Sequence, residues 1–257
     1  MKKVVIATKN EGKLREMKQA LGHLPVEIVS LADFGALPDA VEDADTFLEN
    51  ARIKARFFME QTGCACIADD SGLEVAALSG APGVHSARYA GVHGDDEANN
   101  DLLLKELQDV SEPRTARYGC AIVLARPGRE DVVTYGSCEG EILRARQGEG
   151  GFGYDPLFYS TDLQMTFAEA DPEAKNRVSH RSRAIARLME RLEAEGVVIR
   201  AGLTPTDFMH LKGDFDAYDT EAARLAARYL LRNMNRDADS DHALALLCNE
   251  VYDRVKK

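Results

Sequence analysis

Two adjacent aspartates in this sequence have the chemistry to bind a cation. Asp69 and Asp70 follow an apolar run, residues 64–68, and precede Ser71-Gly72. Neighbouring carboxylates at the end of a strand repel one another, which is costly unless a cation lies nearby. Magnesium is usually held by one or two carboxylates together with substrate phosphates, and a carboxylate there can accept a proton from an attacking water. Asp-Ser-Gly is also common in turns, so the motif alone favours neither interpretation.

A polar loop near the start has the composition of a phosphate-binding site: Thr8-Lys9-Asn10-Glu11-Gly12-Lys13. It lies between an expected strand, residues 4–7, and an expected helix over residues 14–21. Backbone amides at a helix N-terminus favour anions, Lys13 adds a positive charge, and Thr8 and Asn10 add hydrogen-bond donors. The loop lacks the glycine spacing of a Walker A motif. Taken alone, such a loop is more often a solvated helix start with a surface lysine.

A glycine-rich loop has the composition to receive a planar ligand: Gly150-Gly151-Phe152-Gly153-Tyr154-Asp155-Pro156. Glycines let a ligand approach the backbone closely, and Phe152 or Tyr154 can stack on a base. Asp155 can accept a hydrogen bond from a base or sugar. Considered by itself, the loop is explained more simply as a glycine-rich hairpin with aromatic packing.

A fourth polar group, Lys175 with Ser179-His180-Arg181, precedes a strongly periodic helix expected over residues 182–195. In the functional interpretation these side chains clamp a base and a phosphate at the helix N-terminus. In the alternative, Ser179 is a helix cap and the neighbouring side chains are solvated.

The elements that must position these groups alternate between strands and helices. A capping box, Thr46 with Glu49, predicts a helix that ends at Gly63. Pro127-Gly128 is typical of a hairpin turn between two long strands. The predicted strands span residues 4–7, 26–29, 64–68, 114–126 and 131–142, and the predicted helices span residues 14–21, 47–61, 95–107, 168–176 and 182–195. This order predicts an α/β protein.

Composition limits the function classes. The formal net charge of -11 argues against a general nucleic-acid binder, since such a protein needs a basic face. No stretch approaches the roughly 20 apolar residues that span a bilayer, and the short apolar run after Lys2-Lys3 does not have the form of a signal peptide. We therefore expect a cytoplasmic protein without a membrane partner. Its five cysteines have no zinc-site spacing and are expected to be reduced core residues.

Together and in this order, the motifs resemble the inosine/xanthosine triphosphate pyrophosphatase family over residues 1–199. The resemblance implies an α/β fold of two lobes around a long mixed sheet, with a central nucleotide cleft. It also implies hydrolysis of XTP, ITP and dITP to the monophosphate and pyrophosphate, and a homodimer. The motifs that carry it are those above with Thr46-Phe47-Leu48-Glu49-Asn50-Ala51, Ala68-Asp69-Asp70-Ser71-Gly72-Leu73, Gly80-Ala81-Pro82-Gly83 and Ser86-Ala87-Arg88-Tyr89.

The resemblance also implies roles for individual residues. Asp70 is the expected proton acceptor and a ligand of Mg²⁺, and Asp69 is a supporting charge and a further candidate ligand. The phosphates are expected on Thr8, Lys9, Asn10, Glu11, Gly12 and Lys13. Further substrate contacts are expected from Ser71, Phe152, Gly153, Tyr154, Asp155, Lys175, His180 and Arg181.

The sequence departs from the family pattern at one position and leaves two alternatives open. The family usually has two acidic residues before the Thr-Phe motif, but here the pair is Val41-Glu42, so Glu42 is the second candidate metal ligand. One alternative is a Maf-like nucleotide pyrophosphatase with a different base preference, against which Ser179-His180-Arg181 argues. The other is a nucleotide-binding sensor without turnover.

The character of the sequence changes near residue 200. We predict a helical C-terminal extension, residues 200–257, beyond the enzyme domain. The run Gly202-Leu203-Thr204-Pro205-Thr206-Asp207, with the residues after it, weakly resembles a segment of the hydantoinase/oxoprolinase family. The segment is too short to carry that activity and contains no metal constellation. We expect it to pack on the enzyme or on a partner.

Overall fold

The computed structural model describes residues 3–21 and 26–194. The chain divides into two compact units, Met1–Gly22 with Ile28–Leu188 and His23–Glu27 with Met189–Lys257. Every predicted site residue belongs to the first unit. Of the second, only residues 26–27 and 189–194 are described. The predicted C-terminal extension and its resemblance therefore lie outside the described residues.

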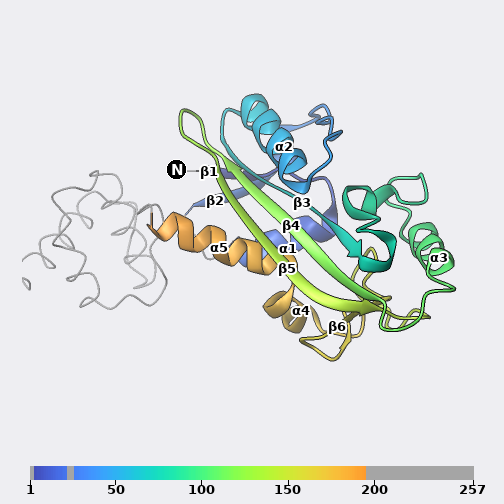
Figure 1. The fold of residues 1–257 in the computed structure, drawn as a ribbon. Helices are drawn as coiled ribbons and strands as arrows, with labels where there is room; N and C mark the ends of the chain where they lie inside the picture. The colour runs from blue at the N-terminus through green and yellow to red at the C-terminus, as the bar shows by residue number, and fades with distance from the viewer. Residues whose placement is uncertain (1–2, 22–25, 195–257) are drawn as a thin grey trace, which may run out of the picture. The chain divides into compact units, whose positions relative to one another are not determined.

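The described residues form a seven-stranded mixed sheet with the order β2-β1-β3-β4-β5-β6-β7 (Figure 1). β1 runs parallel to β3, whereas β4, β5, β6 and β7 each pair antiparallel with the strand before them. The strands are β1 (Lys3–Ile6), β2 (Glu27–Ser30), β3 (Ala65–Val75), β4 (Thr115–Ala125), β5 (Val132–Ile142), β6 (Phe158–Ser160) and β7 (Met165–Thr166). The sheet confirms the predicted α/β class.

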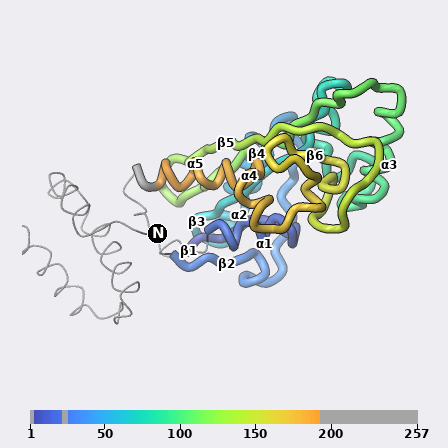
Figure 2. Tube along the Cα trace, turned by 90° about the horizontal axis from the view of Figure 1, so that it is seen from below, coloured from blue at the N-terminus to red at the C-terminus, as the bar shows by residue number. Residues whose placement is uncertain are grey.

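Helices lie on both faces of the long strands (Figure 1). The α-helices are α1 (Glu11–Leu21), α2 (Phe47–Thr62), α3 (Asp96–Glu106), α4 (Pro172–Val178) and α5 (His180–Ala194). Shorter 3-10 turns are η1 (Leu31–Phe34), η2 (Ala76–Leu78) and η3 (Gly83–Arg88). Figure 2 shows α5 lying along β5, with α1 beside β1. The close approach of α5 to β5 requires Gly136, because a Cβ there would lie 2.1 Å from the backbone oxygen of His180.

α2 is the helix that the sequence predicted most accurately. Thr46 accepts a hydrogen bond from the Glu49 backbone N–H at 3.2 Å, and Gly63 ends the helix in the left-handed conformation. Its apolar stripe, Ala51, Ala55 and Phe58, packs on one face of β3 and β4. This arrangement fixes the α2 side of the sheet.

Two core clusters flank the central part of β3. The first contains Cys66 and Ala68 of β3 with the α2 stripe, and the second contains Leu73 and Val75 with Leu103 of α3. The residues between the clusters, 69–72, include the two aspartates. If each core cluster is taken as the centre of one lobe, the acidic motif lies on β3 at the junction of the two lobes.

The predicted boundaries that differ most from the structure concern β3, α1 and α4. The third strand does not end at residue 68, because β4 pairs with every residue from Asp69 to Val75 and so satisfies the backbone. α1 begins earlier than predicted, because the Asn10 side chain caps it. α4 begins at Pro172 rather than residue 168, because Asp171 caps it and proline favours the first helical position.

Two composition-based expectations can be examined in the described part of the chain. None of its helices is long and apolar enough to cross a bilayer. Its four cysteines are free thiols, and Cys66, Cys120 and Cys138 are buried. Burial raises the pKa of Cys66 to about 11 and that of Cys138 to about 12, so these thiols stay protonated core residues.

Candidate active site

The two aspartates point to opposite faces of the sheet. Because β3 continues through them, successive side chains alternate, so the two carboxylates meet different helices. Asp69 faces α1 and α5, where its carboxylate meets Lys13 and Arg181. Asp70 lies on the same side as Ala68, which packs with α2. The two carboxylates still repel one another, because the charge of Asp69 raises the pKa of Asp70, but their partners differ.

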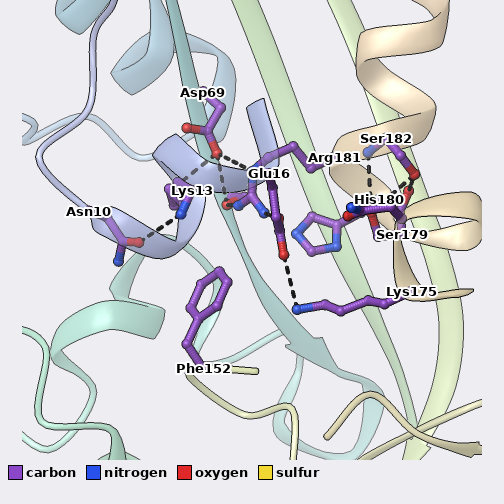
Figure 3. A network of polar contacts seen from close by, with 12 residues as sticks. Asn10, Lys13, Glu16, Asp69, Phe152, Lys175, Ser179, His180, Arg181 and Ser182 are labelled. Carbon is purple, nitrogen blue, oxygen red and sulfur yellow. Dashed lines mark hydrogen bonds and ion pairs between the residues drawn. The ribbon is translucent and has the colours of Figure 1, made fainter. Parts of the chain in front are cut away.

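Asp69 is a fully buried carboxylate with three side-chain partners. Its Oδ2 accepts from Lys13 Nζ at 3.2 Å, from Arg181 Nε at 3.1 Å and from Ser71 Oγ at 3.3 Å. Figure 3 shows Lys13 and Arg181 converging on the carboxylate. Burial alone would raise the pKa of Asp69, but Lys13 and Arg181 hold it far below its usual range. Asp69 therefore ties α1 to α5 through its Oδ2, whereas its Oδ1 is buried without a hydrogen-bond partner among the described residues.

Asp70 is the less compensated of the pair. Its Oδ2 is buried and has no hydrogen-bond partner in the described part of the chain. Burial, together with the charges of Asp69 and Glu42, raises the pKa of Asp70, although Lys13 and Lys54 act against this. A raised pKa makes a carboxylate a better proton acceptor. An oxygen left without a partner in such a place is suited to a cation or a water.

Glu42 lies on the α2 side of the sheet, close enough for its charge to act on Asp70. Its Oε2 accepts from Lys54 Nζ at 2.6 Å. Within residues 3–21 and 26–194, no three Asp, Glu, His or Cys side chains meet as a preformed metal cage. Two carboxylates completed by phosphate oxygens and waters are nevertheless the usual donor set of Mg²⁺. Glu42 and Asp70, with the unpartnered oxygen, fit that ion.

The loop of residues 8–13 joins β1 to α1 beside Asp69. β1 pairs with β3 only as far as Ile67, so the loop opens next to the aspartates. Asn10 Oδ1 accepts from the Lys13 backbone N–H at 2.9 Å, and Thr8 Oγ1 accepts from the Asn10 N–H at 3.2 Å. Lys13 is thereby aimed into the site.

The same loop also has an outward side. Lys9 is half exposed and pairs with Asp39 at 2.5 Å, and Glu11 is exposed. The structure therefore brings Thr8, Asn10 and Lys13 together and directs the side chains of Lys9 and Glu11 outward.

Glu16 is a site residue that the sequence motifs missed. It lies on α1 and contacts two buried cations, Lys175 at 3.1 Å and Arg181 through a short hydrogen bond (Figure 3). Burial alone would raise its pKa, but Arg181 and Lys175 lower it. Because Glu16 follows Lys13 by three residues, helical spacing places both on one face of α1, and that spacing was the available signal.

Lys175 connects this network to the glycine-rich loop. Its Nζ donates to Asp155 Oδ2 at 2.6 Å and lies 4.7 Å from the centre of the Phe152 ring. Asp155 also accepts from the Phe152 backbone N–H at 2.9 Å, which fixes the loop. The ring lies against α1, since a Cβ at Gly12 would come within 2.8 Å of it.

The other residues of the loop have different surroundings. Tyr154 is buried in the second core cluster, where its hydroxyl donates to the Ser86 backbone oxygen at 2.9 Å. Its ring therefore packs in the core, and Phe152 is the aromatic residue that faces the charged network. Gly153 is held through its backbone by Asp96 and Asn100 of α3.

His180 is a neutral, buried imidazole at the start of α5. It stacks on Tyr118, with ring centres 4.7 Å apart. Burial, and the positive charges of Arg181 and Lys175, hold its pKa well below the usual range. Ser179 caps the helix, as in the alternative interpretation of this motif, because its Oγ accepts from the Ser182 N–H at 3.2 Å.

These observations define a class of protein: an α/β fold with a buried charged network between a helix N-terminus and a glycine-rich loop, suited to a ligand that carries phosphates and a planar ring. The sequence model of the Ham1 family matches residues 4–191. The chain belongs to the Ham1 family. The predicted resemblance to inosine/xanthosine triphosphate pyrophosphatases is thereby confirmed.

Relatives and solved structures agree with this assignment. A protein of Desulforamulus reducens named dITP/XTP pyrophosphatase is 50% identical over 189 residues, covering 73% of this chain and 94% of the relative. One of the same name from Geobacillus kaustophilus is 50% identical over 194 residues, covering 75% and 95%. The solved structure of a HAM1 protein from Coxiella burnetii, 41% identical, has a TM-score of 0.69 and covers 76% of this chain and 100% of its own.

Proposed function

We propose that this chain hydrolyses non-canonical purine nucleoside triphosphates, namely XTP, ITP and dITP, to the monophosphate and pyrophosphate in a magnesium-dependent reaction. Relatives at 50% identity named dITP/XTP pyrophosphatase support the activity. The observation that carries the chemistry is the Asp70 carboxylate, whose buried Oδ2 has no hydrogen-bond partner among the described residues and on which the charges of Glu42 and Lys13 act. The proposed proton acceptor and the proposed phosphate-binding lysine are therefore within electrostatic reach of one another.

In the proposed reaction Asp70 accepts a proton from the water that attacks the α-phosphorus, and the bond to the bridging oxygen breaks as pyrophosphate leaves. Lys13 and the N-terminus of α1 stabilise the charge that develops on the phosphates. Glu42 and Asp70 would hold Mg²⁺, which polarises the phosphate oxygens when bound. Asp69 keeps Lys13 and Arg181 in place throughout.

The base would lie in the pocket formed by residues 152–155, Lys175, His180 and Arg181. Phe152 offers its ring for stacking, and the hydrogen-bond donors of the pocket pair with a 6-keto oxygen. A 6-amino base leaves those donors unpaired, which disfavours ATP. The predicted cytoplasmic location and homodimer belong to this proposal, and the molecular mass in solution tests the dimer.

The test is pyrophosphate release from a panel of XTP, ITP, dITP, ATP and pyrimidine triphosphates, with Mg²⁺ and with EDTA. We expect release from the three keto purines, much slower release from ATP, and none in EDTA. A preference for pyrimidine or modified nucleotides would favour the Maf-like alternative. Nucleotide binding without release at micromolar enzyme would favour the sensor.

Asp70→Asn tests the assigned proton acceptor. We expect the turnover number to fall by about 10²–10⁴-fold, the usual contribution of a general base, while nucleotide binding persists. Asp101→Asn is the matched control, because Asp101 of α3 is exposed and pairs with Arg146, which follows β5. Normal turnover in Asp70→Asn would show that another group accepts the proton.

A further inference from the structure

Lys54 is a buried lysine that the sequence motifs did not identify. It lies on α2, is 8% exposed, and donates to Glu42 at 2.6 Å. Lysine is almost never buried without a charged partner. Burial alone would lower the pKa of Lys54, but the carboxylates of Glu42, Asp69 and Asp70 raise it. The ammonium group is therefore charged in a place where two candidate metal ligands lie.

The three carboxylates near Lys54 differ in their own partners. Asp69 is compensated on the other face of the sheet by Lys13 and Arg181. Glu42 has its ion pair with Lys54, and Asp70 keeps a buried oxygen without a hydrogen-bond partner among the described residues. Since β3 directs Asp70 to the α2 side, the charge of Lys54 acts on both members of the pair that fits Mg²⁺. Without it, the half-buried Glu42 would lose its ion-pair partner, and its charge would still act on Asp70.

We propose that Lys54 is a built-in counter-ion that holds Glu42 and Asp70 in position in the metal-free protein, and that shares Glu42 with the divalent cation when the cation binds. This inference rests on the proposed function in one respect: the cation is the Mg²⁺ ion that the proposed reaction uses. Lys54 is thus a positioning residue, acting through Glu42 and Asp70.

The inference gives two effects of opposite sign. Removing the positive charge of Lys54 leaves Glu42 without its ion pair and leaves Lys13 alone to offset Asp70 among the cations that act on it, so the metal-free protein becomes less stable. The same removal makes the site more negative and takes away the group that competes for Glu42, so the cation binds more tightly. A lysine that merely packed on the sheet would show only the first effect.

The experiment compares Lys54→Met with wild type in EDTA and in a titration with MgCl₂, using the melting temperature and calorimetry as readouts. We expect a lower Tm in EDTA, and a half-saturating Mg²⁺ concentration about tenfold lower than that of wild type. Arg56→Met is the matched control: Arg56 lies on the same helix, is exposed, and pairs with Asp131 at 2.9 Å. It should change neither quantity.

Two further variants separate charge from packing. Lys54→Arg keeps the charge and should retain most of the EDTA stability. Asp70→Asn introduced into Lys54→Met should raise its Tm, because one of the two repelling charges is gone. If Lys54→Met does not fold but the double variant does, the conclusion is the same. Failure of both to fold would overturn the inference, since packing would then be the essential contribution.

Other outcomes also contradict the inference. Weaker or unchanged Mg²⁺ binding by Lys54→Met would overturn it, and so would the absence of any response to Mg²⁺ in either protein. The proposed function is decided separately, by Mg²⁺-dependent pyrophosphate release from the wild-type enzyme. The two experiments therefore distinguish an active enzyme in which Lys54 is not a counter-ion from an inactive protein in which it is.

Discussion

Glu16 holds two buried cations side by side, and one substitution removes its charge with little change in shape. In Glu16→Gln the amide oxygen still accepts a hydrogen bond from Lys175 or Arg181, but the amide nitrogen then faces the other cation. The two positive charges near Phe152 lose the carboxylate between them. We expect the folded protein to lose stability as a result.

The size of the loss follows from burial. Breaking a buried ion pair by removing one partner costs about 3–5 kcal/mol, because the other charge stays uncompensated. The side chains of Glu16, Lys175 and Arg181 are 15%, 8% and 2% exposed, so solvent screens them little. Since glutamine keeps one hydrogen bond, and Lys175 and Arg181 keep Asp155 and Asp69 as partners, we expect the lower end, about 3 kcal/mol. For a domain of about 150–250 residues, this lowers Tm by about 6–12 °C.

Urea unfolding at pH 7 measures the loss, and an unchanged m-value shows that the folded state keeps its compactness. Glu173→Gln is the control, because Glu173 is exposed and lies 3.7 Å from the exposed Arg177. Its effect should stay within about 0.5 kcal/mol.

Acid pH gives an independent check on Glu16. The folded pKa of Glu16 lies below its ordinary value of 4.5, so its charge contributes stability above that value, and the contribution is lost as pH falls through the folded pKa. The difference between wild type and Glu16→Gln should therefore be constant near neutral pH and shrink in acid. A loss below about 1 kcal/mol, or a difference that does not shrink, would refute the reasoning.

Two glycine substitutions test the packing that positions the site. In Gly12→Ala the new Cβ would lie 2.8 Å from the Phe152 ring; the ring must move, and we expect KM for ITP to rise with little change in Tm. In Gly136→Ala the Cβ would lie 2.1 Å from the His180 oxygen; α5 must shift, costing about 1–3 kcal/mol in urea unfolding and raising KM. An unchanged KM in both variants would argue against a base pocket at Phe152 and His180.

Local signals in the sequence predicted the elements that are held by local interactions. α2 follows its cap at Thr46 and its glycine stop at Gly63, and the β4–β5 hairpin turns at Pro127-Gly128 as expected. The Asp171-Pro172 start of α4 was also a local signal, although the predicted boundary did not use it. β3 is different. Its second half is polar and glycine-containing, and only the ladder to β4 makes it a strand.

The sequence predicted most of the residues of the charged network but not the ion pairs between them. The motifs named four of its charged residues, Asp69, Lys13, Lys175 and Arg181. Which of them form ion pairs depends on the packing of α1, β3 and α5, and motifs do not show that. Lys54 was beyond motif reasoning, because its role depends on α2 packing against the sheet beside Glu42. Burial is a tertiary property, and it turns an ordinary helix lysine into part of the site.

The continuation of β3 changes what the pair of aspartates means. At a strand end, Asp69 and Asp70 would be two equivalent ligands for one cation. Within a strand, the alternation of side chains gives each its own face and its own partners. The Asp69 carboxylate forms ion pairs with Lys13 and Arg181 and so joins the loop of residues 8–13 to the start of α5. Asp70 instead lies within the electrostatic reach of Glu42 and Lys54, and none of its contacts within residues 3–21 and 26–194 is a hydrogen bond to its buried Oδ2.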